Sequence, residues 1–218
     1  MSVHLRPEEI EAESFRIIDA EAGPHRWSTA EWPVVRRAIH ASADFDYMRT
    51  MVFSPGAVDA GVAALRSGRC IVTDTNMALA GINKRLLTRF GVDASCFVAD
   101  PEVAEDSARH GMTRSIIAMR KAASDRGTGI FVIGNAPTAL FELLRLVREE
   151  GLRPDLVIGI PVGFVGAEES KEELIREAST RPIPFITNRG RKGGSNVAAA
   201  VTNALLLLAD TVHEEKKP

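Results

Sequence analysis

Short apolar segments alternate with longer amphipathic segments along this chain. The apolar segments are "MRTMVF" (48–53), "RCIVTD", "SCFVAD", "GIFVIG", "DLVIGI" and "PFIT". Most of them are continuous apolar runs, and such runs are typical of parallel strands that are covered on both faces. The pattern therefore predicts an α/β fold of three layers, with a mainly parallel sheet and helices on both of its faces.

The segments between the apolar runs carry the periodicity and the end signals of helices. Ser28 and Glu31 have the spacing of a capping box. Ser54 stands where an N-cap residue would, and Pro55 follows it in the first helical position. The predicted helices cover residues 7–22, 28–43, 54–68, 83–91, 101–127 (as one or two helices), 137–150, 167–179 and 195–210.

The chain of 218 residues is long enough for one substantial core. Strands and helices alternate throughout, and no repeat, low-complexity segment or linker interrupts them. We therefore expect one domain over residues 1–210. Residues 211–218, "TVHEEKKP", are expected to form a disordered tail.

Three glycine-bearing turns follow the last three predicted strands. They are "GNAPT" at 134–138, "GIPVGFVGAEESK" at 159–171 and "NRGRKGGSNV" at 188–197. In open α/β sheets, ligands bind beyond the carboxyl ends of the strands, and helix N-termini favour anionic groups there. We therefore expect one anionic ligand to be shared among the three turns.

Nucleotide-binding motifs do not fit these turns. A phosphate loop needs GxxxxGK[ST], and neither "GFVGAEESK" nor "GRKGGS" has that spacing. A dinucleotide fingerprint needs GxGxxG near the first strand, whereas "GIPVGFVG" comes late. Separate anion seats remain, with Lys171, Arg189, Arg191 and Lys192 nearby, and they suit a ligand with several spread-out carboxylates or phosphates. The alternative is that the glycines only permit tight turns and close packing.

Composition narrows the classes of partner. The net charge is −2, with 45% hydrophobic and 26% charged residues, so nucleic acid is not an expected partner. The N-terminus has no apolar signal core, and "NALLLLAD" is too short to span a bilayer, which predicts a cytoplasmic protein without a membrane partner. Cys70 and Cys96 each lie inside an apolar run, so they look like buried strand residues, and they have no metal or redox spacing. The 21 Arg and 6 Lys residues favour two-point carboxylate binding, although base composition of the genome also explains such a bias.

His40 is the candidate for proton transfer. It lies late in a predicted helix, with Arg36 four residues before it and Asp44 four residues after it. An imidazole between such groups suits proton transfer near neutral pH, but a histidine in a surface charge ladder has the same spacing. No covalent nucleophile or metal-ligand spacing is visible, so we expect no metal site and catalysis through positioning and one proton donor.

Several long motifs resemble one known family. "RRAIHASADFDYMRTMVFSPGA", "IGNAPTALFELL", "GIPVGFVGAEESK" and "GRKGGSNVAAA" are similar to segments of precorrin-8X methylmutase, also called cobalt-precorrin-8 methylmutase. "SFRIIDAEA", "TDTNMALAGI" and "TRSIIAM" add to the match. The resemblance covers about residues 10–208, nearly the whole chain.

The resemblance implies an isomerase of cobalamin biosynthesis. Such an enzyme moves a methyl group from C-11 to C-12 of the corrinoid ring of precorrin-8X and gives hydrogenobyrinic acid, or cobyrinic acid when the ring already carries cobalt. It consumes no cofactor and works as a homodimer with a three-layer α/β fold. The histidine that donates a proton in this family aligns with His40.

The resemblance also indicates how the ring would be held. A flat apolar ring with a carboxylate rim suits separate anion seats, apolar side chains such as Met77, Phe164 and Val165, and Arg114 paired with a rim carboxylate. The expected substrate contacts are Ser14, Arg49, Asp74, Met77, Arg114, Asn135, Thr138, Gly163, Phe164, Lys171, Arg191, Gly194 and Ser195.

Two other functions compete with the isomerase. A corrinoid carrier without catalysis would bind the same ring, and only conversion of the ring separates it from the enzyme. A Rossmann-like nucleotide-binding domain would bind nucleotide and no tetrapyrrole. The sequence leaves open whether the natural ring carries cobalt.

Overall fold

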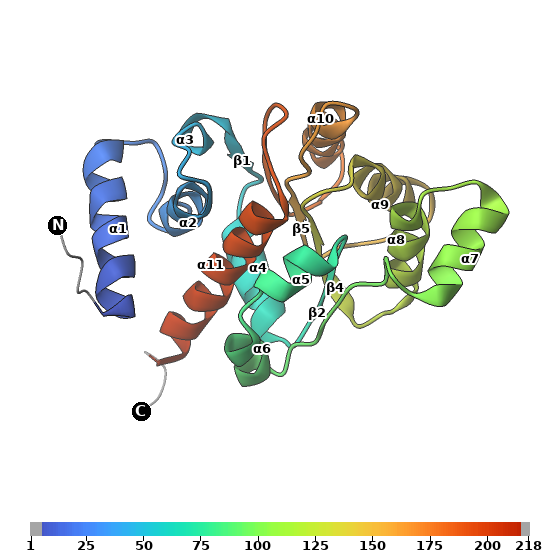
Figure 1. The fold of residues 1–218 in the computed structure, drawn as a ribbon, viewed down its shortest axis with the longest axis horizontal. Coiled ribbons are helices and arrows are strands. Elements are labelled where there is room, and N and C mark those ends of the chain that lie inside the picture. Colours follow the sequence, from blue (N-terminus) through green and yellow to red (C-terminus); the bar gives the residue numbers. More distant parts are fainter. Residues whose placement is uncertain (1–5, 215–218) are drawn as a thin grey trace.

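A sheet of six strands runs through the centre of the computed structural model, which describes residues 6–214 (Figure 1). The strand order is β1-β6-β5-β4-β2-β3. β1 pairs antiparallel with β6, and the other pairings are parallel, so the predicted mainly parallel sheet is confirmed. The strands are β1 (Met51–Phe53), β2 (Cys70–Thr73), β3 (Ala94–Ser95), β4 (Thr128–Ile133), β5 (Leu156–Gly159) and β6 (Phe185–Asn188).

Helices cover both faces of this sheet. α2, α4, α6 and α11 contribute to the core on one face, and α8, α9 and α10 pack on the other. α1 lies against α2 at one end of the molecule and α7 against α8 at the other (Figure 1). The helices are α1 (Pro7–Ala22), α2 (Trp32–Ser42), α3 (Tyr47–Thr50), α4 (Ala57–Arg66), α5 (Asn76–Gly81), α6 (Lys84–Phe90), α7 (Pro101–His110), α8 (Arg114–Ser124), α9 (Pro137–Glu149), α10 (Ala167–Ala178) and α11 (Ser195–Glu214).

Strand β4 shows why the apolar runs are continuous. All six of its residues are buried. Ile130 and Val132 join the core under α2 and α11, whereas Phe131 and Ile133 join the core under α8 and α9. Because successive side chains point to opposite faces, a strand covered on both faces must be apolar at every position.

Three predicted elements differ from the structure. Residues 48–50 of the predicted strand 48–53 belong to the short helix α3, which leaves only β1 as strand. In "SCFVAD", only Ser95 belongs to a strand, and Cys70 and Cys96 are half-buried rather than buried. The predicted cap Ser54 instead accepts a hydrogen bond from the Phe185 N–H at 2.9 Å, and Gly56 is the N-cap of α4.

The predicted tail also begins too early. Helix α11 continues to Glu214, so residues 211–214 are helical and the expectation of a disordered tail is wrong there. Residues 215–218 and 1–5 lie outside the described residues.

Helix α2 is bounded by two local devices. Before it, Ser28 and Glu31 exchange hydrogen bonds at 3.1 and 3.2 Å between backbone N–H and side-chain oxygen, which is the predicted capping box, although the helix itself begins at Trp32. After it, Ala43 takes a left-handed backbone conformation with φ of 52°. The chain therefore turns away immediately after the last turn of α2, which contains His40.

Candidate functional site

The three glycine turns meet at the carboxyl edge of the sheet, as predicted. The turns follow β4, β5 and β6, three adjacent parallel strands. The Gly194 N–H donates to the Ile160 carbonyl at 3.0 Å, and the Gly163 N–H donates to the Arg191 carbonyl at 3.2 Å. Segments that lie far apart in the sequence therefore form one continuous surface.

Two glycines are required where these turns touch. A Cβ on Gly193 would lie 2.3 Å from the Ile160 carbonyl oxygen, and a Cβ on Gly134 would lie 2.7 Å from the Ser195 Cα. Both distances are far inside van der Waals contact, and the opposing atoms belong to backbone. The packing explanation for the glycines is therefore correct at these two positions.

Asp74 closes the first turn from inside the protein. It follows β2 directly and is 1% exposed. Its carboxylate accepts the N–H groups of Gly134 at 2.9 Å, Asn135 at 2.8 Å and Ala136 at 2.7 Å. Burial raises the pKa of Asp74, and the three amide donors oppose that shift by favouring the ionised form. The predicted anion seat in this turn is thus filled by the protein's own carboxylate.

Ser195 is buried in the third glycine turn, and its hydroxyl holds that turn in place. Its Oγ lies 2.8 Å from the Thr75 Oγ1, which also caps α5 by accepting the Ala78 N–H at 3.1 Å. The start of α11 is therefore fastened to the end of β2. Sequence reasoning missed Thr75, although its position before "NMALAG" is that of an N-cap residue.

Lys171 is the second buried charged group near this edge. It is 0% exposed, and its Nζ donates to the Lys192 carbonyl at 2.8 Å and reaches the Asn188 Oδ1 at 3.4 Å. Burial lowers the pKa of Lys171 to about 8, and the more distant Glu168 and Glu172 oppose that shift. The side chain therefore holds the 189–194 segment from beneath.

His40 is exposed in the last turn of α2, without the predicted flanking groups. Arg36 pairs instead with Asp19 at 2.8 Å. Asp44 lies beyond the end of the helix and pairs with Lys192. The proposed ladder of Arg36, His40 and Asp44 is therefore wrong, because α2 ends at Ser42. The imidazole contacts the Phe15 ring edge to face, with ring centroids 5.1 Å apart.

The helix that carries His40 reaches the glycine turns through α11. The Asn196 side-chain amide donates to the Ala41 carbonyl at 3.2 Å. Asn196 lies in the first turn of α11, directly after Gly194 and Ser195. The residue after His40 is thus bonded to the residue after Ser195, which places α2 beside the carboxyl edge.

Apolar side chains project from this edge into solvent. Phe164 is 86% exposed, Val165 is 90% exposed and Met77 is 71% exposed. The Arg191 guanidinium lies over the Phe164 ring, 5.7 Å from its centroid. Large apolar residues rarely stand so exposed in groups without a partner or a ligand.

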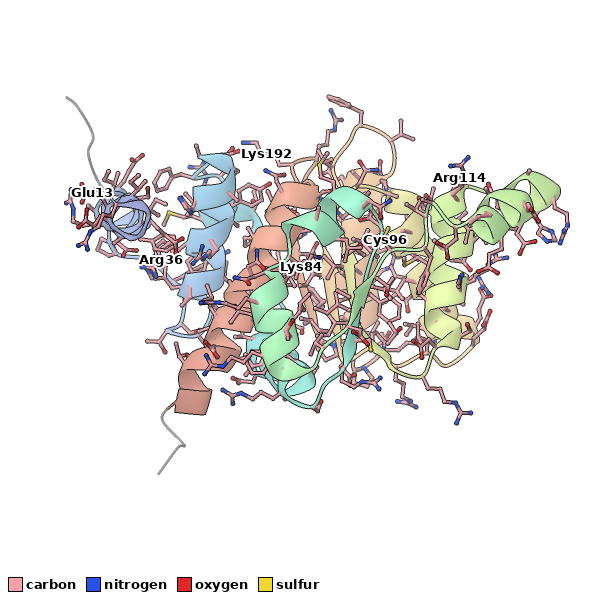
Figure 2. The ribbon with its side chains drawn as sticks, turned by 60° about the horizontal axis from the view of Figure 1, so that its bottom comes forward. Glu13, Arg36, Lys84, Cys96, Arg114 and Lys192 are labelled. Carbon is pink, nitrogen blue, oxygen red and sulfur yellow. The ribbon has the colours of Figure 1, made fainter. Side chains whose placement is uncertain are left out.

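The other predicted contact residues fall into two groups. Arg49, Arg114, Asn135 and Arg191 are exposed. Figure 2 shows Arg114 and Lys192 along the same margin of the molecule. Ser14 and Thr138 are half-buried: the Ser14 hydroxyl donates to the Ile10 carbonyl within α1 at 2.8 Å, and the Thr138 hydroxyl accepts from that of Thr113 at 3.2 Å. Gly163 and Gly194 contribute backbone, with φ of 147° and 137°.

The described residues 6–214 contain neither a cluster of metal ligands nor a helix suited to a membrane. No group of three or more His, Cys, Asp or Glu side chains in this range could hold a metal ion. Nor does any helix in this range have the length and apolar character needed to cross a bilayer.

Comparison with known proteins gives a consistent result over nearly the whole chain. A family model described as precorrin-8X methylmutase matches residues 9–208. The cobalt-precorrin-8 methylmutase of Priestia megaterium is 48% identical over 207 residues, which cover 95% of this chain and 90% of that protein. The precorrin-8X methylmutase of Sinorhizobium sp is 39% identical over 192 residues, which cover 88% and 90%. A crystal structure of precorrin-8X methylmutase from Thermus thermophilus is 45% identical, with a TM-score of 0.83 over 93% of this chain and 98% of that chain.

The fold and the site together define a three-layer α/β protein whose candidate site lies at the carboxyl edge of its sheet. The chain belongs to the precorrin-8X methylmutase family. It is therefore an enzyme, an isomerase of cobalamin biosynthesis, and the resemblance found in the sequence is confirmed.

Proposed function

We propose that this isomerase moves one methyl group from C-11 to C-12 of precorrin-8X to give hydrogenobyrinic acid, or of cobalt-precorrin-8 to give cobyrinic acid. The observation that carries the proposal is the place of His40. Its imidazole is exposed in the last turn of α2, and the next residue is bonded to the first turn of α11. A proton donor there stands beside the surface that the glycine turns build.

The ring lies on the exposed apolar side chains of this surface. Met77, Phe164 and Val165 have the area and the exposure to cover part of a flat macrocycle. Arg49, Arg114 and Arg191 are exposed cations that pair with carboxylates of the rim, and Arg forks hold a carboxylate by two hydrogen bonds. Asn135, Thr138, Ser14 and the backbone at Gly163 add neutral contacts.

Four of the predicted contact residues act through other residues. Asp74, Lys171, Gly194 and Ser195 are buried in the described chain, and their polar groups bind the turns that carry the exposed side chains. We assign them to shaping the site. The buried charged groups therefore hold the turns in position, and the exposed charged groups on the same turns are left to contact the ring.

In the proposed mechanism, His40 donates a proton to a ring nitrogen. The protonated ring is more electron-poor, which lowers the barrier to methyl migration. One carbon–carbon bond at C-11 breaks as one at C-12 forms, and the proton returns to His40, so no co-reactant is consumed. General acid catalysis of this kind contributes about 10²–10⁴-fold in rate, and positioning of the ring supplies the remainder.

The test is an absorbance time course of the purified protein with precorrin-8X and, separately, with cobalt-precorrin-8. We expect conversion to the product spectrum without added cofactor. His40→Ala should lower turnover about 10²–10⁴-fold while the bound ring still shifts the spectrum. His25→Ala is the matched control, because His25 stacks on Trp32 at the opposite end of the same helix, with ring centroids 4.0 Å apart.

The other outcomes of these experiments would contradict parts of the proposal. Near-normal turnover by the His40→Ala variant would refute the acid role. A spectral shift without conversion of either ring would indicate a corrinoid carrier in place of an enzyme. The two substrates also decide whether the natural ring carries cobalt.

Two further properties belong to the proposal. We expect a homodimer, on the grounds of the family resemblance, and light scattering measures the mass directly. We place the enzyme in the cytoplasm because the resemblance is to biosynthetic enzymes.

A further inference from the structure

Residues 189–194 are hereafter called the rim loop. One of them, Lys192, is fixed through both its backbone and its side chain. The Lys192 carbonyl accepts the Lys171 Nζ at 2.8 Å and the Asn188 Nδ2 at 2.8 Å. The loop backbone is held further by the Arg189 N–H, which donates to the Thr50 carbonyl at 2.8 Å. The backbone of the rim loop is therefore anchored to β6, α10 and α3.

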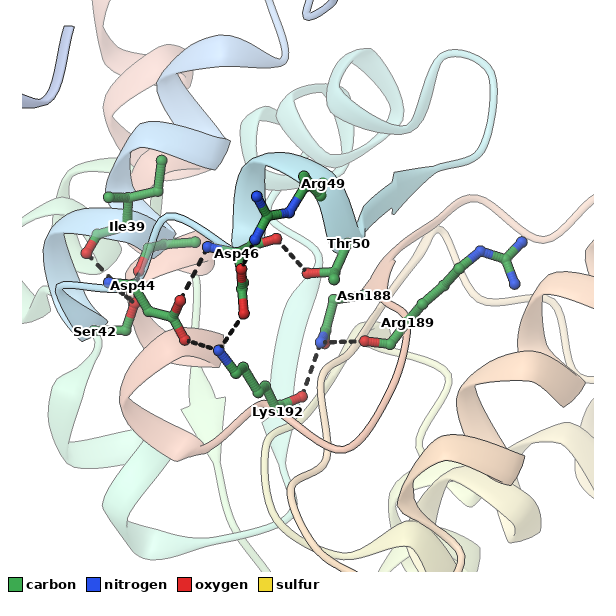
Figure 3. Close-up of polar contacts among 10 residues, drawn as sticks. Ile39, Ser42, Asp44, Asp46, Arg49, Thr50, Asn188, Arg189 and Lys192 are labelled. Carbon is green, nitrogen blue, oxygen red and sulfur yellow. Dashed lines mark hydrogen bonds and ion pairs between the residues drawn. The ribbon is translucent and has the colours of Figure 1, made fainter. Parts of the chain in front are cut away.

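The side chain of Lys192 points the other way and joins two carboxylates (Figure 3). Its Nζ lies 2.5 Å from the Asp44 Oδ2 and 2.6 Å from the Asp46 Oδ2. The Asp44 Oδ1 also accepts the Asp46 N–H at 2.9 Å, and the Arg49 guanidinium contacts Asp46. Lys192, Asp44 and Asp46 form the lysine clamp.

The two acids of the lysine clamp belong to the connection that leaves the His40 helix. Helix α2 ends at Ser42, one residue after Ala41. Ala43 follows with a left-handed backbone, and Asp44 comes next. The clamp thus connects the end of α2 to the loop that carries Arg191. The two groups it connects are the proposed proton donor and a proposed rim contact.

The charges explain why a lysine is needed at this place. Without Lys192, two carboxylates would face each other beside a site proposed to receive a ring with many carboxylates. The hydrogen bond from Lys192 lowers the pKa of Asp46, and the hydrogen bonds to Asp44 and Asp46 raise the pKa of Lys192, so Asp46 and Lys192 both stay charged at neutral pH. An isolated exposed ion pair contributes little, whereas Lys192 meets two carboxylates at once and extends from a backbone that is already fixed, so its pairing costs side-chain freedom alone.

We propose that Lys192 is a positioning residue that sets the distance between His40 and the rim loop. The catalytic consequence rests on the proposed function, but the mechanical consequence does not. Removing the ammonium should free the 44–50 segment and the rim loop together. A change in one segment alone would mean that Lys192 does not connect them.

The test is hydrogen–deuterium exchange of the full chain, followed in peptides that cover residues 44–50 and 189–195. Lys192→Met should accelerate exchange about fivefold in both peptides. Asp44→Asn removes one arm of the clamp from the opposite side and should give the same pattern, and Lys192→Arg should restore slow exchange. Lys121→Met is the matched control, because Lys121 in α8 also bridges two acids, Asp100 and Glu102, outside these segments.

Kinetics with the corrinoid substrate provides the second measurement. We expect Lys192→Met to lower kcat about tenfold and Lys121→Met to leave it unchanged, since a small misplacement of a reacting group is costly. Unchanged exchange at 44–50 in Lys192→Met would overturn the proposal, and so would faster exchange with a normal kcat. If the wild-type protein converts no ring, the proposed function fails, while the exchange data still decide whether the clamp exists.

Discussion

The turns at 134–138 and at 189–194 look alike in the sequence, but they are held in opposite ways. In the first, a buried carboxylate, that of Asp74, binds three backbone N–H groups from below. In the second, buried Lys171 binds a backbone carbonyl, and the loop presents Arg191 outward. A glycine turn before a helix is therefore open to an external anion only when no internal carboxylate reaches it first. Substitutions on the two sides test this difference.

Asp74→Ala should have the largest effect on stability. It leaves three N–H groups without their acceptor in a buried place, so we expect the free energy of unfolding to fall by about 3–5 kcal/mol. Urea unfolding monitored by circular dichroism measures the change. Asp106→Ala, which removes an exposed helix pair with Arg109, should cost under about 1 kcal/mol. Equal losses in the two variants would show that Asp74 does not support the first turn.

Gly193→Ala should have the next largest effect and tests the contact between the second and third turns. The new Cβ would meet the Ile160 carbonyl oxygen, so the backbone must shift at a cost of about 2–3 kcal/mol. Gly190→Ala in the same loop has open space and a φ of 77°, and should cost about 1 kcal/mol from backbone strain alone. Thermal unfolding of both variants ranks them, and the reverse order would contradict the contact.

Lys171→Met should have the smallest effect, and it should stabilise the protein. The folded pKa is lowered from 10.5 to about 8, so between these pH values the unfolded chain binds more protons, and wild-type stability rises with pH. Below pH 8, burial of the ammonium costs up to about 3 kcal/mol, part of which the hydrogen bond to Lys192 offsets. We therefore expect the free energy of unfolding of Lys171→Met to exceed that of the wild type by about 1 kcal/mol at pH 7, and we expect this difference to be lost by pH 10.5.

Urea unfolding at pH 7 and at pH 10 measures this effect, with Lys84→Met as the control for an exposed lysine. A variant that is less stable than the wild type at pH 7 would show that the hydrogen bonds of Lys171 outweigh its burial. The rim loop should exchange faster in Lys171→Met even where the whole protein is more stable, because the loop has lost an anchor.

The sequence predicted the fold well because continuous apolar strands leave few alternatives. β4 is buried on both faces and was placed within a few residues. The errors fall where the local signal was ambiguous. The segment "MRTMVF" is apolar enough for a strand, but its first half belongs to helix α3, and only its second half, β1, pairs with β6. Ser54 has the chemistry of a cap, but its hydroxyl is used by the Phe185 N–H.

The sequence predicted that the three turns converge, but it did not predict the contacts that hold them. The convergence of the three turns follows from parallel topology, and the structure places them together. The sequence could not predict that Asp74 and Lys171 point inward, because residues at the end of a buried strand or in the first turns of a helix can face either way. Asp46 and Asn196 were missed because their partners, Lys192 and Ala41, lie about 150 residues away in the chain.

The antiparallel strand β1 has a consequence for the order in which this protein is made. Met51 pairs with Asn188, and α2 packs on α11, so the first quarter of the chain finds these partners only in the last fifth. A growing chain on the ribosome can form β2, β4 and β5 while α1 to β1 still wait for β6 and α11. The segment with His40 is therefore synthesised first and docks last, and a chain released before residue 188 lacks the edge that positions it.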